Sequence, residues 1–292
     1  MTGWILYEKK DADKNKKYIE MFMTQAANYK VPLSLVLIED LVHGTMANDT
    51  DIPKAIPDFI VNRSRNASVA AHFEQMNCRV FNPSIVTKLC NHKRLTYDFV
   101  QKHGIPIMDT VYTYEDAASM RFPFVVKPAC GHGGNCVTLV HNRDELQFAV
   151  NAIKEKYQEN SDIVFQCCAS DIGKDLRVYV LNGTVIAAVM RQAYDCNHIP
   201  NLSDPNVDIR SNYSLGHTAS LHTLTEEEAA LVNQIIPLLP FDCIGIDFVY
   251  EKGHPSFNEI EDAVGARMLY ANSEIDIVSE YFRYIINTVH KP

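Results

Sequence analysis

Residues 244–250 read IGIDFVY and residues 256–260 read SFNEI, two short apolar runs separated by a segment that contains a glycine. Runs of this length, rich in β-branched and aromatic residues, predict the two strands of an antiparallel hairpin. A second hairpin is predicted for residues 176–181 and 184–191, because the Asn-Gly pair between them favours a tight turn between strands. The second part of the chain is therefore expected to be α+β.

The first 84 residues have a different texture, in which short apolar strands alternate with helical stretches. Such alternation predicts a small parallel α/β unit of the Rossmann-like type. Leu33–Ile38 is expected to be one of its buried strands. The other predicted strands are Trp4–Tyr7, Phe59–Val61 and Arg79–Phe81, and the predicted helices are Tyr18–Tyr29 and Val69–Met76.

Helices and strands of mixed order are predicted after residue 84. A capping box, Thr225-Glu226-Glu227-Glu228, is expected to open a helix that ends near Leu239, and a last helix is expected from about Ile275. We expect three units, residues 1–84, 85–166 and 167–292. The remaining predicted helices are Ile85–Cys90, Lys93–His103 and Glu145–Tyr157, and the remaining strands are Phe124–Lys127, Val137–Val140 and Ile163–Gln166.

Charge and hydropathy exclude several classes of protein. The 292 residues include 27 Lys+Arg and 36 Asp+Glu, a formal charge of −9, so we expect no nucleic-acid partner. No apolar run reaches the roughly 18 residues of a membrane-spanning helix, and Trp4–Tyr7 is too short for the core of a signal peptide. A cytoplasmic protein without a membrane partner is predicted, and a homo-oligomer remains open.

The eight cysteines contain no Cys-x-x-Cys pair and no Cys/His cluster with zinc spacing. A chain of this size does not need disulfides for stability, so reduced thiols are expected. The pair Cys167-Cys168 could indicate redox chemistry. We favour the interpretation that both are small apolar residues in a buried strand.

A lysine stands at the end of an apolar strand, in FVVKP (residues 124–128), and a glycine-rich segment, GHGG (residues 131–134), follows. The ammonium group of Lys127 would supply positive charge, and small residues would let backbone N–H groups approach phosphate oxygens. The pattern is neither a Walker loop nor a Rossmann fingerprint. It is compatible with a polyphosphate site, and also with a solvated lysine beside an ordinary turn.

Three carboxylates occupy the hairpin of residues 244–261. Glu259 and Glu261 are two apart and would point to one face of a strand, and the hairpin register could place Asp247 opposite them. Three carboxylates on one face repel unless a cation lies between them, and all-oxygen ligands suit Mg²⁺ or Mn²⁺. The alternative is a solvated acidic edge of the hairpin.

Basic residues are placed among the apolar strands of the other hairpin. Arg177 follows Asp175 by two positions, and Arg191 ends the partner strand. Guanidinium groups near a phosphate and metal site would stabilise the charge that develops in phosphoryl transfer. A plain surface salt bridge between Arg177 and Asp175 is the alternative.

The order of these pieces carries more information than any one of them. The succession resembles the ATP-grasp superfamily, and within it the RimK-like and bacterial glutathione-synthetase-like ligases, over about residues 79–270. The resemblance implies a pre-ATP-grasp domain followed by a two-lobed ATP-grasp fold. It rests on Lys93, residues 124–134, Gln166, residues 173–178 (GKDLRV), Arg191, Arg210-Ser211-Asn212, Gly245-Ile246-Asp247 and residues 258–261 (NEIE).

The resemblance also implies roles for single residues. Lys93 and Lys127 would hold ATP phosphates beneath the loop with Gly131, Gly133 and Gly134, and Gln166 with Cys167 would form the hinge that meets adenine. Asp175 and Arg177 would also bind the nucleotide. Arg191, Arg210 and Asn212 would be catalytic, the last two as part of a RimK-like signature with Ser211, Gly216 and Ala219, and Asp247, Glu259 and Glu261 would hold Mg²⁺ or Mn²⁺.

Three positions depart from the family pattern. The last metal position is usually Asn and is Glu261 here, which adds a negative charge. The hinge usually has an acidic residue where this chain has Cys167, and the RimK-like signature carries a basic residue shortly before Gly216, where this chain has Leu215.

The implied activity is ATP-dependent ligation of a carboxylate to an amine through an acyl phosphate, with small-molecule or peptide substrates. An ATP-grasp phosphotransferase and a nucleotide-binding regulatory module without turnover are the alternatives. Arg267 follows the metal-binding strand and is the candidate to bind a substrate carboxylate, unless it is a surface or helix-capping arginine.

Overall fold

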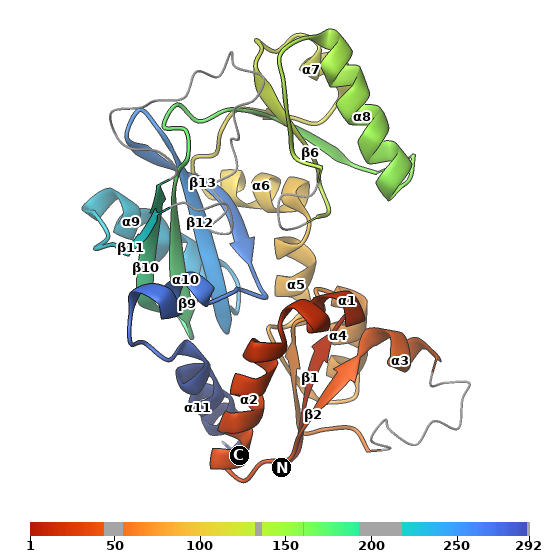
Figure 1. The fold of residues 1–292 in the computed structure, drawn as a ribbon, viewed down its shortest axis with the longest axis vertical. Coiled ribbons are helices and arrows are strands. Elements are labelled where there is room, and N and C mark those ends of the chain that lie inside the picture. The colour runs from red at the N-terminus through yellow and green to blue at the C-terminus, as the bar shows by residue number, and fades with distance from the viewer. Residues whose placement is uncertain (44–54, 132–135, 160, 193–217, 291–292) are drawn as a thin grey trace.

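The computed structural model describes residues 1–43, 55–131, 136–159, 161–192 and 218–290. Three sheets follow one another along the long axis of the molecule (Figure 1). A four-stranded parallel sheet lies at one end, a five-stranded antiparallel sheet lies in the middle, and a four-stranded antiparallel sheet forms a lobe at the other end. The expected Rossmann-like unit and two-lobed remainder are confirmed.

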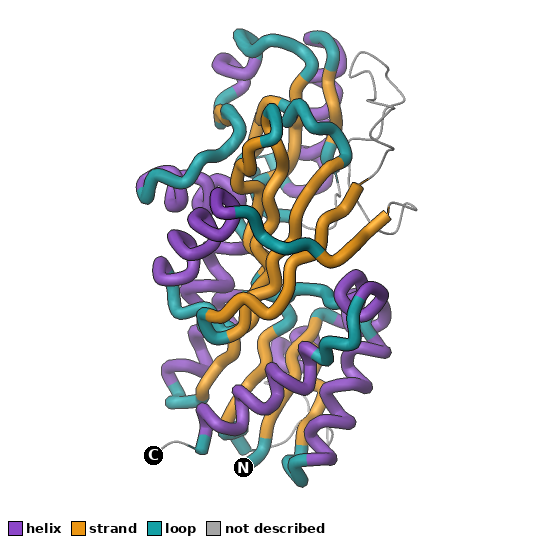
Figure 2. The backbone as a smooth tube through the Cα atoms, turned by 90° about the vertical axis from the view of Figure 1, so that its left-hand side faces the viewer, coloured by secondary structure: helices purple, strands orange, loops and turns teal. Residues whose placement is uncertain are grey.

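The parallel sheet has the order β2-β1-β3-β4. Its central strand β1 is buried throughout, and alternate side chains enter the apolar clusters on the two faces. Helices therefore lie on both sides of this sheet (Figure 2). Its elements are β1 (Gly3–Tyr7), α1 (Lys9–Lys14), α2 (Lys16–Asn28), β2 (Leu33–Leu37), α3 (Ile38–His43), β3 (Phe59–Asn62), α4 (Ala67–Gln75) and β4 (Arg79–Phe81).

One strand prediction in this unit is wrong. Leu33–Ile38 was expected to be buried, but β2 is an edge strand in which Val36 is buried and Leu35 is 40% exposed. The apolar run resembles that of a central strand, and the position in the sheet depends on the tertiary fold.

The terminal lobe carries the four-stranded sheet with the order β5-β8-β6-β7. Its helix α8 begins after Asn142, whose side chain accepts a hydrogen bond from the N–H of Glu145, and packs its apolar face on the sheet. The elements are β5 (Thr110–Val111), α7 (Tyr114–Ala117), β6 (Phe124–Pro128), β7 (Thr138–Val140), α8 (Arg143–Tyr157) and β8 (Ile163–Cys167), and α5 (Ser84–Cys90) and α6 (Lys93–Lys102) precede them.

The middle sheet has the order β11-β10-β9-β12-β13. Asn182 and Gly183 have φ angles of 48° and 74°, so the predicted tight hairpin turn is present. The capping box at Thr225 is also present, but the α-helix ends at Ile235 and a 3₁₀ turn follows, because Pro237 cannot continue it. The elements are β9 (Lys174–Leu181), β10 (Thr184–Gln192), β11 (Thr218–Leu221), α9 (Glu226–Ile235), η2 (Ile236–Leu238), β12 (Cys243–Glu251), β13 (His254–Glu261), α10 (Arg267–Asn272) and α11 (Ile277–Val289).

The two ends of the chain meet. Helix α11 packs against α2 of the parallel unit, with Phe22 and Phe282 in edge-on ring contact. Asn82, just after β4, donates to the carbonyl of Cys243 at the start of β12 and to that of Asp262 just after β13. These two strands form the hairpin that carries the predicted metal ligands. The parallel unit thus fixes the position of that hairpin.

No helix in the described part of the chain is long and apolar enough to cross a membrane.

Candidate active site

Six charged residues form a row across one face of the middle sheet. The strand register pairs Arg191 with Asp175, Arg177 with Asp247, and Asp247 with Glu259. Asp175 and Arg177 are two apart on β9, and Glu259 and Glu261 are two apart on β13, so each pair shares a face. We call this set the charged row: Arg191, Asp175, Arg177, Asp247, Glu259 and Glu261.

A β-bulge sets the direction of the carboxylates on β13. Asp247 is opposite Glu259 but Phe248 is opposite Phe257, so Asn258 is an extra residue in β13. Without the bulge, Phe257 and Glu259 would point to the same face. With it, Phe257 packs in the core against Phe248, and Glu259 joins the charged row.

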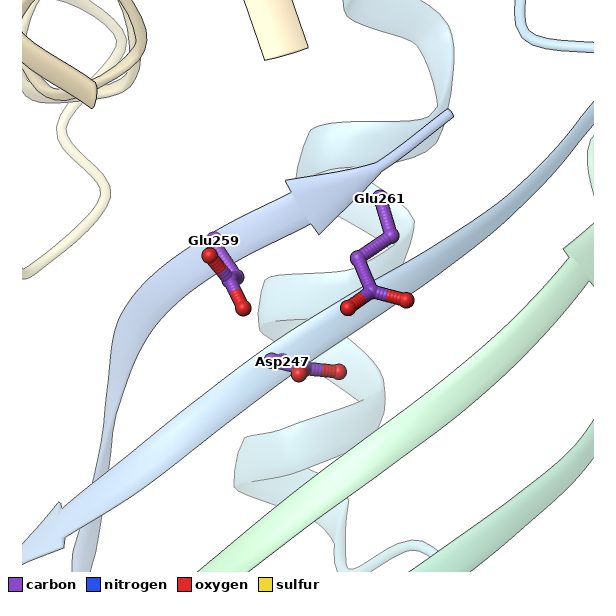
Figure 3. Close-up of side chains that lie close together, drawn as sticks. All are labelled: Asp247, Glu259 and Glu261. Atoms are coloured by element: carbon purple, nitrogen blue, oxygen red, sulfur yellow. The ribbon is translucent and has the colours of Figure 1, made fainter. Parts of the chain in front are cut away.

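The three predicted metal ligands converge. Oxygen atoms of Asp247, Glu259 and Glu261 lie within 4.8 Å of one another, and Figure 3 shows the three carboxylates pointing toward one shared space. Asp247 is 1% exposed, which excludes a merely solvated acidic edge. An all-oxygen donor set of this kind fits Mg²⁺, so the residues present suit the metal that the family pattern implies.

Arg177 balances part of this negative charge. Its Nε and Nη2 atoms lie 2.8 and 2.6 Å from Oδ1 and Oδ2 of Asp247, and Nη2 lies 2.9 Å from Oε1 of Glu261. Arg177 is buried and its guanidinium faces the carboxylates, so the alternative of a surface salt bridge with Asp175 is wrong.

Arg191 extends the network to the other side of β9. It pairs with Asp175 through Nε and Nη2, and its Nη2 lies 3.2 Å from Oδ2 of Asp247. Burial alone would raise the pKa of Asp247, but the two guanidinium groups overcome this effect and hold that pKa below its ordinary value. Asp247 is therefore an anion at neutral pH.

The buried ammonium group of Lys127 comes from the terminal lobe. Its Nζ donates to the hydroxyl of Tyr97 (2.9 Å) and to Oε1 of Gln166 (2.8 Å), and Gln166 in turn donates to Thr110. Burial lowers the pKa of Lys127 to about 8, and the charge of Glu259 opposes that shift. Lys127 therefore lies close enough to the middle sheet to sense one of its carboxylates.

Lys93 contacts Gly131, the first residue of the glycine-rich segment. It is the first residue of α6, and its Nζ donates to the carbonyl oxygen of Gly131 at 2.6 Å. Its backbone N–H donates to Ala129. The structure thus brings Lys93 to the start of the predicted phosphate-binding loop.

The remaining predicted residues divide into two groups. Both cysteines are free and half-buried: Cys167 is the last residue of the buried strand β8, as expected, whereas Cys168 lies just beyond the strand. Arg267 is the exposed first residue of α10. Ala219 lies on β11, whereas Gly133, Gly134, Arg210, Ser211, Asn212, Leu215 and Gly216 lie outside the described residues.

Two residues of the site were not found from the sequence. Tyr97 lies one helical turn after Lys93, and an i, i+4 search from that lysine could have found it. Arg63 is buried without a carboxylate partner in the described part of the chain, and it donates to Tyr7 and to the carbonyls of Ala263 and Val264. No local sequence pattern predicts these hydrogen bonds of Arg63, because its partners are 56 to 201 positions away in the sequence.

Comparisons with known proteins give a consistent family. Residues 98–285, more than half of the chain, match the model of the RimK-like ATP-grasp domain. β-Citrylglutamate synthase B of Danio rerio is 28% identical over 213 residues, which cover 69% of this chain and 48% of that protein. The chain therefore spans about half the length of this relative.

A relative of more similar length and a solved structure extend the comparison. The probable α-L-glutamate ligase of Aeromonas salmonicida is 26% identical over 226 residues, covering 75% of this chain and 71% of that protein. The crystal structure of D-alanine–D-alanine ligase from Bacillus anthracis complexed with ATP superposes with a TM-score of 0.71 at 14% identity, covering 99% of this chain and 97% of that one. The overall fold is shared.

Proposed function

The chain belongs to the RimK-like ATP-grasp family, and on that premise we propose that it is an ATP-dependent ligase that joins a carboxylate to an amine. A carboxylate oxygen attacks the γ-phosphorus of ATP, which gives an acyl phosphate and ADP. The amine then attacks the acyl carbon and phosphate leaves, so an amide forms and the amine loses a proton. ATP and Mg²⁺ are the expected requirements, and we propose Mn²⁺ as a substitute.

The main difficulty of the first step is the approach of two anions. We assign Lys93 and Lys127 to the ATP phosphates and Arg191 to the transferred γ-phosphoryl group, where fixed positive charge stabilises the transition state. Asp247, Glu259 and Glu261 would hold Mg²⁺, which neutralises phosphate charge when bound. Gln166 and Cys167 would form the hinge beside adenine.

The observation that carries this assignment is the meeting of two elements from different lobes. The Lys127 ammonium group on β6 lies near enough to Glu259 on β13 for the negative charge of that carboxylate to oppose the lowering of the lysine pKa by burial. A phosphate-binding cation and a metal-binding carboxylate cluster on facing elements are the arrangement that a bound Mg²⁺–nucleotide needs.

The substrates are proposed as a class. The relatives' names refer to citrylglutamate synthesis and glutamate ligation, so we propose an amino-acid-like or peptide carboxylate and an amino-acid-like amine. We propose units 1–84, 85–166 and 167–292, in which the second unit closes on the third over the nucleotide, and a cytoplasmic location.

The experiment is a screen for ADP release over amino acids, dicarboxylates and short peptides, with products identified by mass spectrometry. An amide product with equal amounts of ADP and phosphate is expected. A phosphoester with ADP but without free phosphate would favour the phosphotransferase. ATP binding without ADP release over the whole panel would favour the regulatory module. Lys127→Ala is the loss-of-binding control, and Arg94→Ala, an exposed ion-pair residue of α6, is the matched control.

A further inference from the structure

The topology of the parallel sheet marks one of its edges as a place for ligands. The chain goes from β1 to β2 on one side of β1 and then crosses to β3 on the other side. In open α/β sheets, the carboxyl ends of two such strands are where ligands bind, because the connections leave in opposite directions. Here this switch-point edge consists of residues 8–11, which follow β1, and residues 62–66, which are the last residue of β3 and the turn after it.

A guanidinium group stands at this edge. Nη1 of Arg65 lies 2.7 Å from Oδ2 of Asp11, so the two connections are joined by an ion pair. The Arg65 backbone has a φ angle of 58°, which a residue with a side chain seldom adopts. Hydrogen bonds from Ser64 to Asn62 and from Asn66 to Ser64 hold the turn.

The switch-point edge is hydrogen-bonded to residues 263 and 264, which follow β13. Arg63 donates to the carbonyls of Ala263 and Val264 at 3.0 and 3.1 Å. Burial raises the pKa of Glu261, and Arg65 is among the positive charges that oppose this shift. Arg65, two residues after Arg63, therefore lies beside the segment that follows Glu261, on the side of the middle sheet opposite to the lobe that carries Lys127.

The guanidinium group of Arg65 has N–H donors beyond the one that contacts Asp11. The side chain is 26% exposed, and among the described residues its contact is with Asp11 through Nη1. A guanidinium carries five N–H donors in a planar fork, which matches the two oxygens of a carboxylate. The edge formed by its Nε and Nη2 atoms is the part that could receive an anion.

We propose that Arg65, oriented by Asp11, binds a carboxylate of the substrate other than the carboxylate that is activated. The proposal deepens the proposed function and rests on it. The reacting carboxylate must lie at the γ-phosphate beside Asp247 and Glu259, and Arg65 is placed to bind a second carboxylate of the same molecule. The substrate class is thus an acidic amino acid or another dicarboxylate.

The test compares diacids with their monoamides on the full-length chain. The probes are L-glutamate and L-aspartate, paired with L-glutamine, L-isoglutamine and L-asparagine, and binding is measured by thermal shift and calorimetry with ADP and Mg²⁺. We expect wild type and the Arg94→Ala control to bind a diacid at least about tenfold more tightly than its monoamides. Arg65→Ala should abolish this preference, and Arg65→Lys should retain part of it.

Four results would overturn the proposal. They are absence of diacid binding while ATP still raises the melting temperature, equal binding of diacid and monoamide by wild type, an undiminished preference in Arg65→Ala, and a loss of ATP affinity in Arg65→Ala as large as the loss of diacid affinity. Failure of the proposed function is distinct: ATP with Mg²⁺ would then neither stabilise the wild type nor be converted to ADP with any substrate.

Discussion

The guanidinium group of Arg177 bridges two candidate metal ligands, with Nη2 2.6 Å from Asp247 and 2.9 Å from Glu261. Asp247 is thus both a structural ion-pair partner and a predicted metal ligand. Glu259, in contrast, makes no ion pair with a cation in the described ranges. Substitutions of the two residues should therefore have separable effects.

Asp247→Asn should abolish turnover and also lower the free energy of unfolding by about 3 kcal/mol, since it leaves buried guanidinium charge without its main partner. Glu259→Gln should abolish turnover with a change in unfolding free energy within about 0.5 kcal/mol. Urea denaturation and ADP release measure the two effects. Near-wild-type activity of Glu259→Gln at limiting Mg²⁺ would show that the metal assignment is wrong.

Glu261→Asn tests whether the additional charge of this chain is needed. The substitution restores the residue usual in the family, so we expect turnover within about threefold of wild type. Mg²⁺ half-saturation should rise, because an anionic oxygen ligand is replaced by a neutral one. The measurement is ADP release against Mg²⁺ concentration, and an inactive variant that still binds ATP would contradict the expectation.

ATP binding should depend on pH through Lys127. Its pKa is lowered to about 8 by burial, and phosphate binds the protonated form. Affinity should therefore be constant below about pH 8 and fall by up to tenfold per pH unit above it. Tyr97→Phe removes an acceptor for the ammonium group and should move the midpoint to lower pH. In Lys127→Arg the fall should disappear, and a fall that persists there would assign it to another group.

Arg267→Lys tests the carboxylate site expected from the sequence. Arg267 is exposed at the start of α10, and a lysine cannot reproduce its two parallel hydrogen bonds. If Arg267 binds substrate, KM for the carboxylate substrate should rise far more than KM for ATP. Kinetic constants equal to those of wild type for every substrate would leave Arg267 with a surface role.

Elements with a local signal were predicted well from the sequence. The Asn182-Gly183 turn and the Thr225 capping box are each predicted by a few neighbouring residues, and both are present. The grouping of Asp247 with Glu259 and Glu261 followed from strand alternation and hairpin register. These features depend on interactions within a few residues or across one turn.

Features that depend on distant contacts were not predicted. The bulge at Asn258 is needed to direct Phe257 into the core, and the alternation of side chains along a regular strand does not predict a bulge. The partner of Arg177 is 70 residues away in sequence, and Asp175, its apparent partner, is taken by Arg191. The edge position of β2 likewise depends on the order of strands.

The most direct test of the central claim is oxygen transfer from the acid substrate to phosphate. With the activated carboxylate labelled with ¹⁸O, attack on the γ-phosphorus followed by displacement by the amine must leave one labelled oxygen in each phosphate released. We predict phosphate with one ¹⁸O atom, formed in equal amount with ADP and amide. Unlabelled phosphate beside an amide product, or a phosphoester formed without free phosphate, would contradict an acyl-phosphate ligase.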